Sequence, residues 1–344
     1  MIKVLVVDDS AVMRSIMSRI IESQPDMRLA GVASDPVVAT ERLRSLSPDV
    51  ITLDVEMPRM DGLAFLAKLM QTRPLPVVMV SSLTARGADT TLRALELGAV
   101  DFMAKPELSS VADLERYAEQ VAEKLRAAAA ARIPKRSAPV APRKLLARSA
   151  VARSDRVIVI GSSTGGVEAL REVLVPLPPT MPPLLIAQHM PAGFTQNFAR
   201  RLDTLCELEV REAEDRQPLQ AGHAYLAPGG WHLSLGARAG RLETRLSQEP
   251  PINRHRPSVE ALFRSAAEAR DARPIGVMLS GMGADGAEAM LDLKRRGAHN
   301  IAQDEASCVV FGMPKQAIAL GAVHDVLPLS EIAPRLVELC LAND

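Results

Sequence analysis

The stretch that decides the fold runs from Arg156 to Leu174 and reads R-V-I-V-I-G-S-S-T-G-G-V-E-A-L-R-E-V-L. Its β-branched run, Val157–Ile160, predicts a strand buried on both faces of a parallel sheet. Gly161–Gly166 predicts a tight turn, and the apolar spacing from Val167 onward predicts a helix. A strand, a small-residue turn and a helix in this order place the turn at the carboxyl edge of the sheet, where ligands and reactive side chains collect.

This turn is open to two interpretations. Gly161–Gly165 matches G-x-S-x-G, which would make Ser163 an exposed nucleophile on a sharp elbow. Alternatively, the turn is a glycine-rich phosphate cradle whose serines only donate hydrogen bonds. The turn alone favours neither interpretation.

Length and composition predict a soluble globular protein with two domains, since the chain has 344 residues, 47% hydrophobic and 24% charged. We find no secretory leader and no apolar run long enough to span a bilayer, so we expect a cytoplasmic protein without membrane insertion. The net charge is zero, but two mildly acidic segments flank a basic one near residues 126–156. That basic segment lacks aromatic residues, and no helix-turn-helix pattern follows it, so we do not expect a nucleic-acid partner.

The first 125 residues alternate strand-like and helical runs, such as the helical patterns Val12–Glu22 and Asp89–Leu97. This alternation predicts a doubly wound parallel sheet of the flavodoxin-like kind. The predicted strands are Ile2–Val7, Arg28–Ala33, Val50–Leu53, Pro76–Val80 and Asp101–Ala104.

Polar residues follow these strands where each one ends: Asp8, Asp9, Asp54, Ser81 and Lys105. Carboxylates that converge on one edge repel each other unless a cation lies among them, and Mg²⁺ prefers such oxygen ligands. Asp54 would then be placed to attack a phosphoryl group, while the lysine and the hydroxyl hold the phosphoryl oxygens. Each aspartate taken singly could instead be a helix N-cap.

The motifs V-V-D-D-S (6–10), L-D-V-E-M-P-R-M-D-G (53–62), M-V-S-S (79–82) and M-A-K-P (103–106) closely resemble the response-regulator receiver domain. The resemblance implies that a partner histidine kinase phosphorylates Asp54. It implies an Mg²⁺ site of Asp9 and Asp54, with Asp8 supporting. It further implies switch roles for Ser81, Lys105 and Phe102, although Phe102 could equally be a core phenylalanine.

After a predicted helix over Val111–Leu125, the chain becomes basic and rich in alanine and proline, which predicts a flexible linker. We therefore divide the chain into a domain at 1–125, a linker at 126–154 and a domain at 155–344. The last of these repeats the α/β rhythm and predicts a Rossmann-like parallel sheet, with a short antiparallel hairpin around Pro228–Gly230. Its predicted strands are Val157–Ile160, Pro183–Ala187, Ala224–Ala227, His232–Leu235, Pro274–Leu279 and His299–Gln303.

Ser163, His189 and Asp285 each follow a predicted strand of this second sheet, so we expect them at one edge. A serine nucleophile, a histidine base and an orienting carboxylate are the elements of a hydrolytic triad, which is recognised by geometry and not by chain order. The other histidines, at 223, 232, 255, 299 and 324, lie in loops or at element ends without a comparable setting. A competing interpretation takes Gly281–Gly286 as a dinucleotide-binding G-x-G-x-x-G with Asp304 as its ribose-binding acid. We disfavour it because Asp285 would face the pyrophosphate.

The motifs V-I-G-S-S-T-G-G, A-Q-H-M-P-A-G-F-T, Y-L-A-P-G-G-W-H, R-P-S-V-E and L-S-G-M-G-A-D-G resemble the methylesterase domain of the CheB family of chemotaxis response regulators. The resemblance implies hydrolysis of glutamate γ-methyl esters on methyl-accepting chemotaxis receptors, and deamidation of receptor glutamines, without a cofactor for the esterase reaction. It implies that Ser163, His189 and Asp285 are the triad, and that the unphosphorylated receiver shields them. Ser162 departs from the family, in which alanine is commoner, and Glu260 stands where aspartate is usual.

Overall fold

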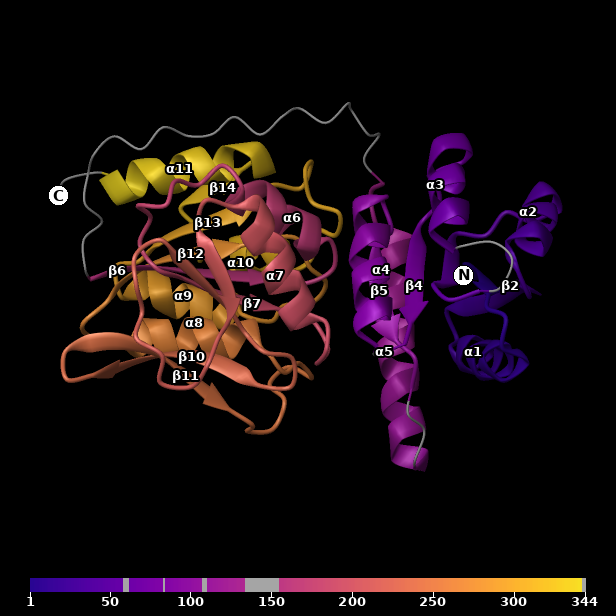
Figure 1. Ribbon diagram of the computed structural model, residues 1–344, viewed down its shortest axis with the longest axis horizontal. Coiled ribbons are helices and arrows are strands. Elements are labelled where there is room, and N and C mark those ends of the chain that lie inside the picture. The colour runs from indigo at the N-terminus through magenta and orange to yellow at the C-terminus, as the bar shows by residue number, and fades with distance from the viewer. Residues whose placement is uncertain (58–61, 83, 107–109, 134–154, 342–344) are drawn as a thin grey trace. The chain divides into compact units, whose positions relative to one another are not determined.

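The computed structural model describes residues 1–57, 62–82, 84–106, 110–133 and 155–341. The chain separates into two compact units, Met1–Lys135 and Arg136–Asp344, which are treated separately below (Figure 1). Most of the predicted linker, residues 134–154, lies outside the described residues. No helix in the described part of the chain combines the length and apolar character needed to cross a membrane.

The N-terminal unit is built on a parallel sheet with the strand order β2-β1-β3-β4-β5, which confirms the predicted flavodoxin-like fold. The strands are β1 (Ile2–Val7), β2 (Met27–Ala33), β3 (Val50–Asp54), β4 (Val77–Ser81) and β5 (Asp101–Ala104). The strand order reverses between β1 and β3, and ligands of such sheets bind outside the carboxyl ends of the strands at that point. Asp8 and Asp9 follow β1 and Asp54 ends β3, so the sheet brings these carboxylates together.

Helices connect the strands of this unit: α1 (Ala11–Ser23), α2 (Pro36–Ser45), α3 (Gly62–Thr72), α4 (Ala85–Glu96) and α5 (Val111–Ala130). Helix α5 is longer than predicted, since it continues past Leu125 to Ala130. Leu125 and Ala128 are fully buried, and the Arg126 guanidinium pairs with the Asp26 carboxylate at 2.8 Å. The residues directly after Leu125 therefore pack as part of the N-terminal unit.

The C-terminal unit contains a seven-stranded parallel sheet with the order β14-β13-β12-β6-β7-β9-β8. Its strands are β6 (Arg156–Ser162), β7 (Leu184–Gln188), β8 (Glu209–Glu212), β9 (His223–Leu226), β12 (Arg273–Met278), β13 (His299–Gln303) and β14 (Asp325–Leu327). Every residue of the central strand β6 is buried, as its β-branched run predicts. The Rossmann-like parallel sheet is confirmed.

Helices cover both faces of this sheet (Figure 1). They are α6 (Gly166–Leu174), α7 (Thr195–Leu205), α8 (Val259–Glu268), α9 (Ala287–Arg295), α10 (Met313–Ala319) and α11 (Leu329–Leu341). Val157 and Val159 of β6 belong to one apolar cluster with Phe263 of α8 and Met290 of α9. Successive residues of a strand point to opposite faces, so the alternate residues of β6 pack on the other side, where α6 contacts α11.

The predicted hairpin around Pro228–Gly230 is wrong. Strand β9, which precedes this turn, pairs in parallel with β7 and β8. The chain then leaves the sheet, and β10 (His232–Arg238) pairs antiparallel with β11 (Arg241–Ser247) in a separate two-stranded sheet. The hairpin turn is Ala239-Gly240, where φ is +50° and +75°, the positive values that a two-residue hairpin connection of type I′ requires.

Gly286 and Gly297 have nearly the same positive φ but differ in the space around them. Comparing their substitutions separates the cost of the backbone conformation from the cost of overpacking. Gly297 has φ +88° and nothing within 4 Å of an added Cβ, whereas at Gly286 (φ +84°) that Cβ would lie 2.3 Å from Val259 Cγ1. We predict that Gly297→Ala lowers the free energy of unfolding by about 1–2 kcal/mol, the cost of a left-handed backbone. Gly286→Ala should cost about 1–3 kcal/mol more, because it also overpacks the core.

Urea unfolding followed by the fluorescence of Trp231, the one tryptophan of the chain, reports on the C-terminal unit. Equal destabilisation by the two substitutions would contradict this prediction.

Candidate active site

Ser163 and His189 are brought together by the register of two neighbouring strands. Ser162 of β6 is the partner of Gln188 of β7, so the residues that follow them leave adjacent strands side by side. The His189 backbone N–H donates to the Ser162 carbonyl at 3.1 Å, and the Ser163 N–H donates to the Ser280 carbonyl at 3.0 Å. Ser163 therefore stands at the carboxyl edge, between the ends of β7 and β12.

The two adjacent serines have different environments. Ser162 is fully buried, and its hydroxyl donates to Gln188 Oε1 at 2.6 Å. Ser163 is partly exposed. Strand β6 also extends through Gly161 and Ser162, so the turn is shorter than predicted. Of the two hydroxyls, that of Ser163 is the one that a substrate can reach.

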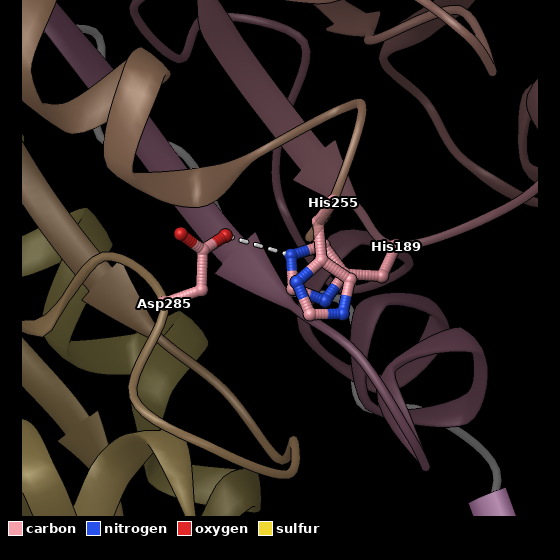
Figure 2. Close-up of side chains that lie close together, drawn as sticks. All are labelled: His189, His255 and Asp285. Atoms are coloured by element: carbon pink, nitrogen blue, oxygen red, sulfur yellow. Dashed lines mark hydrogen bonds and ion pairs between the residues drawn. The ribbon is translucent and has the colours of Figure 1, made fainter. Parts of the chain in front are cut away.

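Asp285 is a buried carboxylate held by several donors. Its oxygens accept hydrogen bonds from His189 Nε2 at 2.8 Å (Figure 2), Asn253 Nδ2 at 2.8 Å, Ser258 Oγ at 2.9 Å and the Val259 N–H at 2.7 Å. Burial opposes ionisation, but the contacts with His189, Asn253 and Val259 outweigh it and lower the pKa of Asp285 to about 2. These donors thus favour the ionised form of Asp285 beside the imidazole.

His189 is fixed by this carboxylate, and its side chain is only 6% exposed. Because Nε2 is engaged by Asp285, a proton exchanged with any other group would pass through Nδ1. A carboxylate bonded to one ring nitrogen sets the tautomer and stabilises the imidazolium form.

His255 was missed by the sequence analysis, which gave it no setting comparable to that of His189. Its imidazole stacks on that of His189, with ring centroids 3.7 Å apart and planes 7° apart (Figure 2). The loop that carries it has positive φ at Asn253 and Arg254. The only signal for it in the sequence is its position just before the R-P-S-V-E motif, because a loop residue has no periodicity that reveals its direction.

The ligand atoms of His189, His255 and Asp285 lie within 4.8 Å of one another, which raises the possibility of a metal site. Imidazole binds a metal through a lone pair in the plane of the ring, and two stacked, nearly parallel rings share no such plane. The arrangement therefore fits ring stacking and not joint coordination of one ion.

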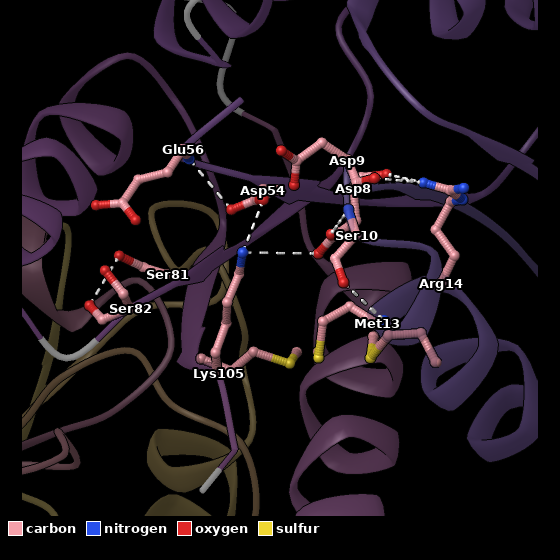
Figure 3. Close-up of polar contacts among 12 residues, drawn as sticks. Asp8, Asp9, Ser10, Met13, Arg14, Asp54, Glu56, Ser81, Ser82 and Lys105 are labelled. Atoms are coloured by element: carbon pink, nitrogen blue, oxygen red, sulfur yellow. Dashed lines mark hydrogen bonds and ion pairs between the residues drawn. The ribbon is translucent and has the colours of Figure 1, made fainter. Parts of the chain in front are cut away.

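The N-terminal unit has its own polar cluster at the carboxyl edge (Figure 3). Asp54 is fully buried, and its Oδ2 lies 2.7 Å from Lys105 Nζ, which is 4.0 Å from Asp8 Oδ2. Burial is the largest influence and outweighs the Lys105 contact, while Asp8 acts in the same direction as burial, so the pKa of Asp54 rises to about 6.

The residues predicted to hold Mg²⁺ lie together. One carboxylate oxygen from each of Asp8, Asp9 and Asp54 falls within 4.8 Å of the others, and burial likewise raises the pKa of Asp8. Lys105 supplies one positive charge against these carboxylates. Hard oxygen ligands with excess negative charge, one of them exposed to solvent, fit Mg²⁺.

The predicted switch residues are adjacent in the fold. Ser81 is fully buried at the end of β4, where its hydroxyl donates to the Ser82 carbonyl at 3.3 Å, and its carbonyl accepts from the Lys105 N–H at 2.7 Å. Phe102 on β5 is 2% exposed, so in this conformation it is a core side chain.

The competing dinucleotide interpretation gains no support from the structure. Asp304 accepts hydrogen bonds from the N–H and hydroxyl of Ser307, at 2.9 and 2.6 Å, within its own loop. Asp285 lies inside the glycine turn and is bonded to His189. Both acids are thus engaged by the protein itself.

We predict that Asp9→Asn weakens Mg²⁺ binding about tenfold or more, the factor that corresponds to ~1.4 kcal/mol, because it removes the exposed carboxylate of the cluster. Calorimetric titration of the full chain with Mg²⁺ measures this. Glu22→Gln, which removes an exposed carboxylate from the far end of α1, is the matched control and should bind as the parent does. Equal affinities for Asp9→Asn and the parent would exclude Asp9 as a ligand.

Comparison with known proteins covers both units. The family model for the CheB methylesterase matches residues 158–336, and that for the response regulator receiver domain matches residues 4–115. The protein-glutamate methylesterase/protein-glutamine glutaminase of Pectobacterium atrosepticum is 54% identical over 336 residues, covering 98% of this chain and 96% of that protein. The protein of the same name from Bordetella parapertussis is 56% identical over 339 residues, covering 98% and 96%.

The C-terminal unit also resembles a solved structure. The crystal structure of the Thermotoga maritima CheB methylesterase catalytic domain is 43% identical, covers 54% of this chain and 100% of that one, and has a TM-score of 0.53. With relatives this similar over nearly the full length, the chain belongs to the CheB methylesterase family and carries a response-regulator receiver domain ahead of its methylesterase domain.

Proposed function

We propose that this chain is a phosphorylation-regulated serine esterase of bacterial chemosensory signalling. It hydrolyses glutamate γ-methyl esters on methyl-accepting chemotaxis receptors, releases methanol, and deamidates receptor glutamines to glutamate. Ser163 is the nucleophile, His189 the base and Asp285 the orienting acid. The observation that carries the proposal is the buried 2.8 Å contact between His189 and Asp285 at the edge where Ser163 stands.

In the first half-reaction, Ser163 Oγ attacks the ester carbonyl carbon while His189 Nδ1 accepts the hydroxyl proton. The Asp285 carboxylate stabilises the imidazolium that forms. Backbone N–H groups of the glycine-rich turns can stabilise the oxyanion. When the tetrahedral intermediate collapses, the C–O bond to the methoxy group breaks, and the imidazolium returns its proton so that methanol leaves.

In the second half-reaction, His189 takes a proton from water, whose oxygen attacks the acyl carbon. The ester bond to Ser163 breaks, Ser163 Oγ regains a proton from His189, and glutamate is released. A glutamine side chain follows the same steps with ammonia as the leaving group. One set of side chains thus accounts for both activities.

Regulation acts through the receiver domain. A carboxylate oxygen of Asp54 attacks the phosphorus of a phosphohistidine on the partner kinase, the N–P bond breaks, and Lys105 stabilises the phosphoryl charge. Asp9 and Asp54, with Asp8 supporting, would hold Mg²⁺, which neutralises phosphoryl charge when bound. We assign the switch roles to Ser81, Phe102 and Lys105.

We further propose the division into a receiver at 1–125, a basic segment at 126–154 that begins with the last turn of α5 and continues as a linker, and an esterase domain at 155–344. Because its phosphodonor is a signalling kinase, we place the enzyme in the cytoplasm.

Methanol release from methylated receptor membranes tests the nucleophile. We predict that Ser163→Ala lowers kcat by at least about 10³-fold, because the attacking oxygen is lost. Ser162→Ala should keep most of the activity, since the Ser162 hydroxyl faces Gln188 and not the substrate. The reverse pattern would show that Ser162 is the nucleophile.

The same assay with a small-molecule phosphodonor and Mg²⁺ tests the regulatory site. We predict that the donor raises the parent's rate and leaves that of Asp54→Asn unchanged, because the amide cannot form the acyl phosphate. Asp113→Asn, which removes a carboxylate from the start of α5, should respond as the parent does. Stimulation of Asp54→Asn by the donor would place the phosphorylation site elsewhere.

A further inference from the structure

We propose that Gln188 is a positioning residue, whose side-chain amide holds the nucleophile and the base at a fixed separation. The inference rests on the proposed function, because it takes Ser163 as the nucleophile and His189 as the base. Gln188 is the last residue of β7 and is 3% exposed, so substrate does not reach it. It would act through its neighbours.

The amide nitrogen of Gln188 bonds to both reactive residues. Its Nε2 donates to the Ser163 carbonyl at 3.0 Å and to the His189 carbonyl at 3.2 Å. These carbonyls follow the ends of two different strands, β6 and β7. One planar group thus joins the peptide units that carry the nucleophile and the base.

The orientation of this amide is fixed by its partners. Both carbonyl oxygens can only accept, so the NH₂ group must face them. The Gln188 Oε1 then accepts the Ser162 hydroxyl hydrogen bond at 2.6 Å. The Ser162 hydroxyl therefore orients the amide from its oxygen end.

The turn also leaves space for this amide. An added Cβ at Gly166 would lie 2.2 Å from Gln188 Oε1 and 2.7 Å from Ser162 Cβ. Its neighbour Gly165 has φ +79°, a conformation that favours glycine, but Gly166 begins α6 and has no such positive φ. Space for the Gln188 amide and the Ser162 side chain bonded to it, and not backbone conformation, therefore explains glycine at position 166.

If Gln188 only stabilised the fold, replacing another buried amide that bridges two carbonyls should have the same effect on the reaction. The C-terminal unit contains such an amide. Asn300 of β13 is fully buried, and its Nδ2 donates to the Met290 and Ala322 carbonyls at 2.7 and 2.8 Å. It thus bridges two backbone carbonyls as Gln188 does. Asn300 lies in the first half of β13, away from the carboxyl edge, so Asn300→Asp is the matched control.

The test compares Gln188→Glu and Asn300→Asp in the full-length enzyme. Each replaces an NH₂ donor by an oxygen that faces two carbonyls, so both should lower stability. We expect kcat for methanol release to fall about 10–100-fold in Gln188→Glu, since small misplacements of reactive groups cost up to about 10²-fold. KM should stay within about twofold of the parent, because a displaced nucleophile leaves uniform substrate binding intact. Asn300→Asp should keep the parent kcat.

Gly166→Ala provides a second route if Gln188→Glu does not fold, because the added methyl group displaces the amide, together with the Ser162 side chain bonded to it, without changing the chemistry of either. It should lower kcat with KM unchanged. The rate at which a fluorophosphonate labels Ser163 should fall in parallel, and this rate does not depend on the receptor substrate.

A parent-like kcat in folded Gln188→Glu or Gly166→Ala would overturn the inference, as would an equal loss of kcat in Asn300→Asp. The proposed function fails separately, through activity that survives Ser163→Ala.

Discussion

The C-terminal site depends on one constraint, the burial of the Asp285 charge. A carboxylate that is 3% exposed is costly unless donors surround it. The donors come from His189 after β7, from Asn253 in the loop after β11, and from the start of α8 at Ser258 and Val259. Satisfying this one charge therefore fixes the imidazole, the loop that carries His255 and the entry into α8. The geometry of the proposed triad thus follows from the rules for buried charge.

Each unit places an aspartate at the carboxyl edge of its parallel sheet, yet the two pKa values are shifted in opposite directions. Burial dominates at Asp54, where Lys105 Nζ and the Glu56 N–H are its donors, and its pKa rises to about 6. Donors dominate at Asp285, and its pKa falls to about 2. An anion that rarely binds a proton suits a group that must stabilise an imidazolium. A carboxylate with few donors and close acidic neighbours suits a site that awaits a cation and a phosphoryl group.

The sequence alone predicted those features of the site that depend on where the strands end. Ser163 and His189 directly follow buried apolar strands, and Asp285 lies in the turn after a third, so all three were predicted to lie at the edge where parallel strands end. The edge strands β8 and β14 were not predicted, since they are short and only partly buried. The stacking of His255 on His189 could not be predicted, because a loop with positive φ at Asn253 and Arg254 determines where the His255 side chain points. The glycines at 229–230 suggested a hairpin, but an added Cβ at Gly229 would lie 2.3 Å from the Ala192 backbone N, so close packing explains glycine there.

The choice between a phosphate cradle and a nucleophile elbow depends on where the N–H groups of the Gly161–Gly166 turn are directed. A cradle needs backbone N–H groups that point at the anion. Here the Ser163 N–H donates to the Ser280 carbonyl, and the Gly166 N–H donates to the Ser163 carbonyl. The Ser163 carbonyl also accepts from Gln188, so the backbone of this residue is held by the protein on both sides. Two N–H groups of this turn therefore bond within the protein, while Ser163 itself stays partly exposed. This arrangement favours Ser163 as a reactive hydroxyl over a phosphate cradle.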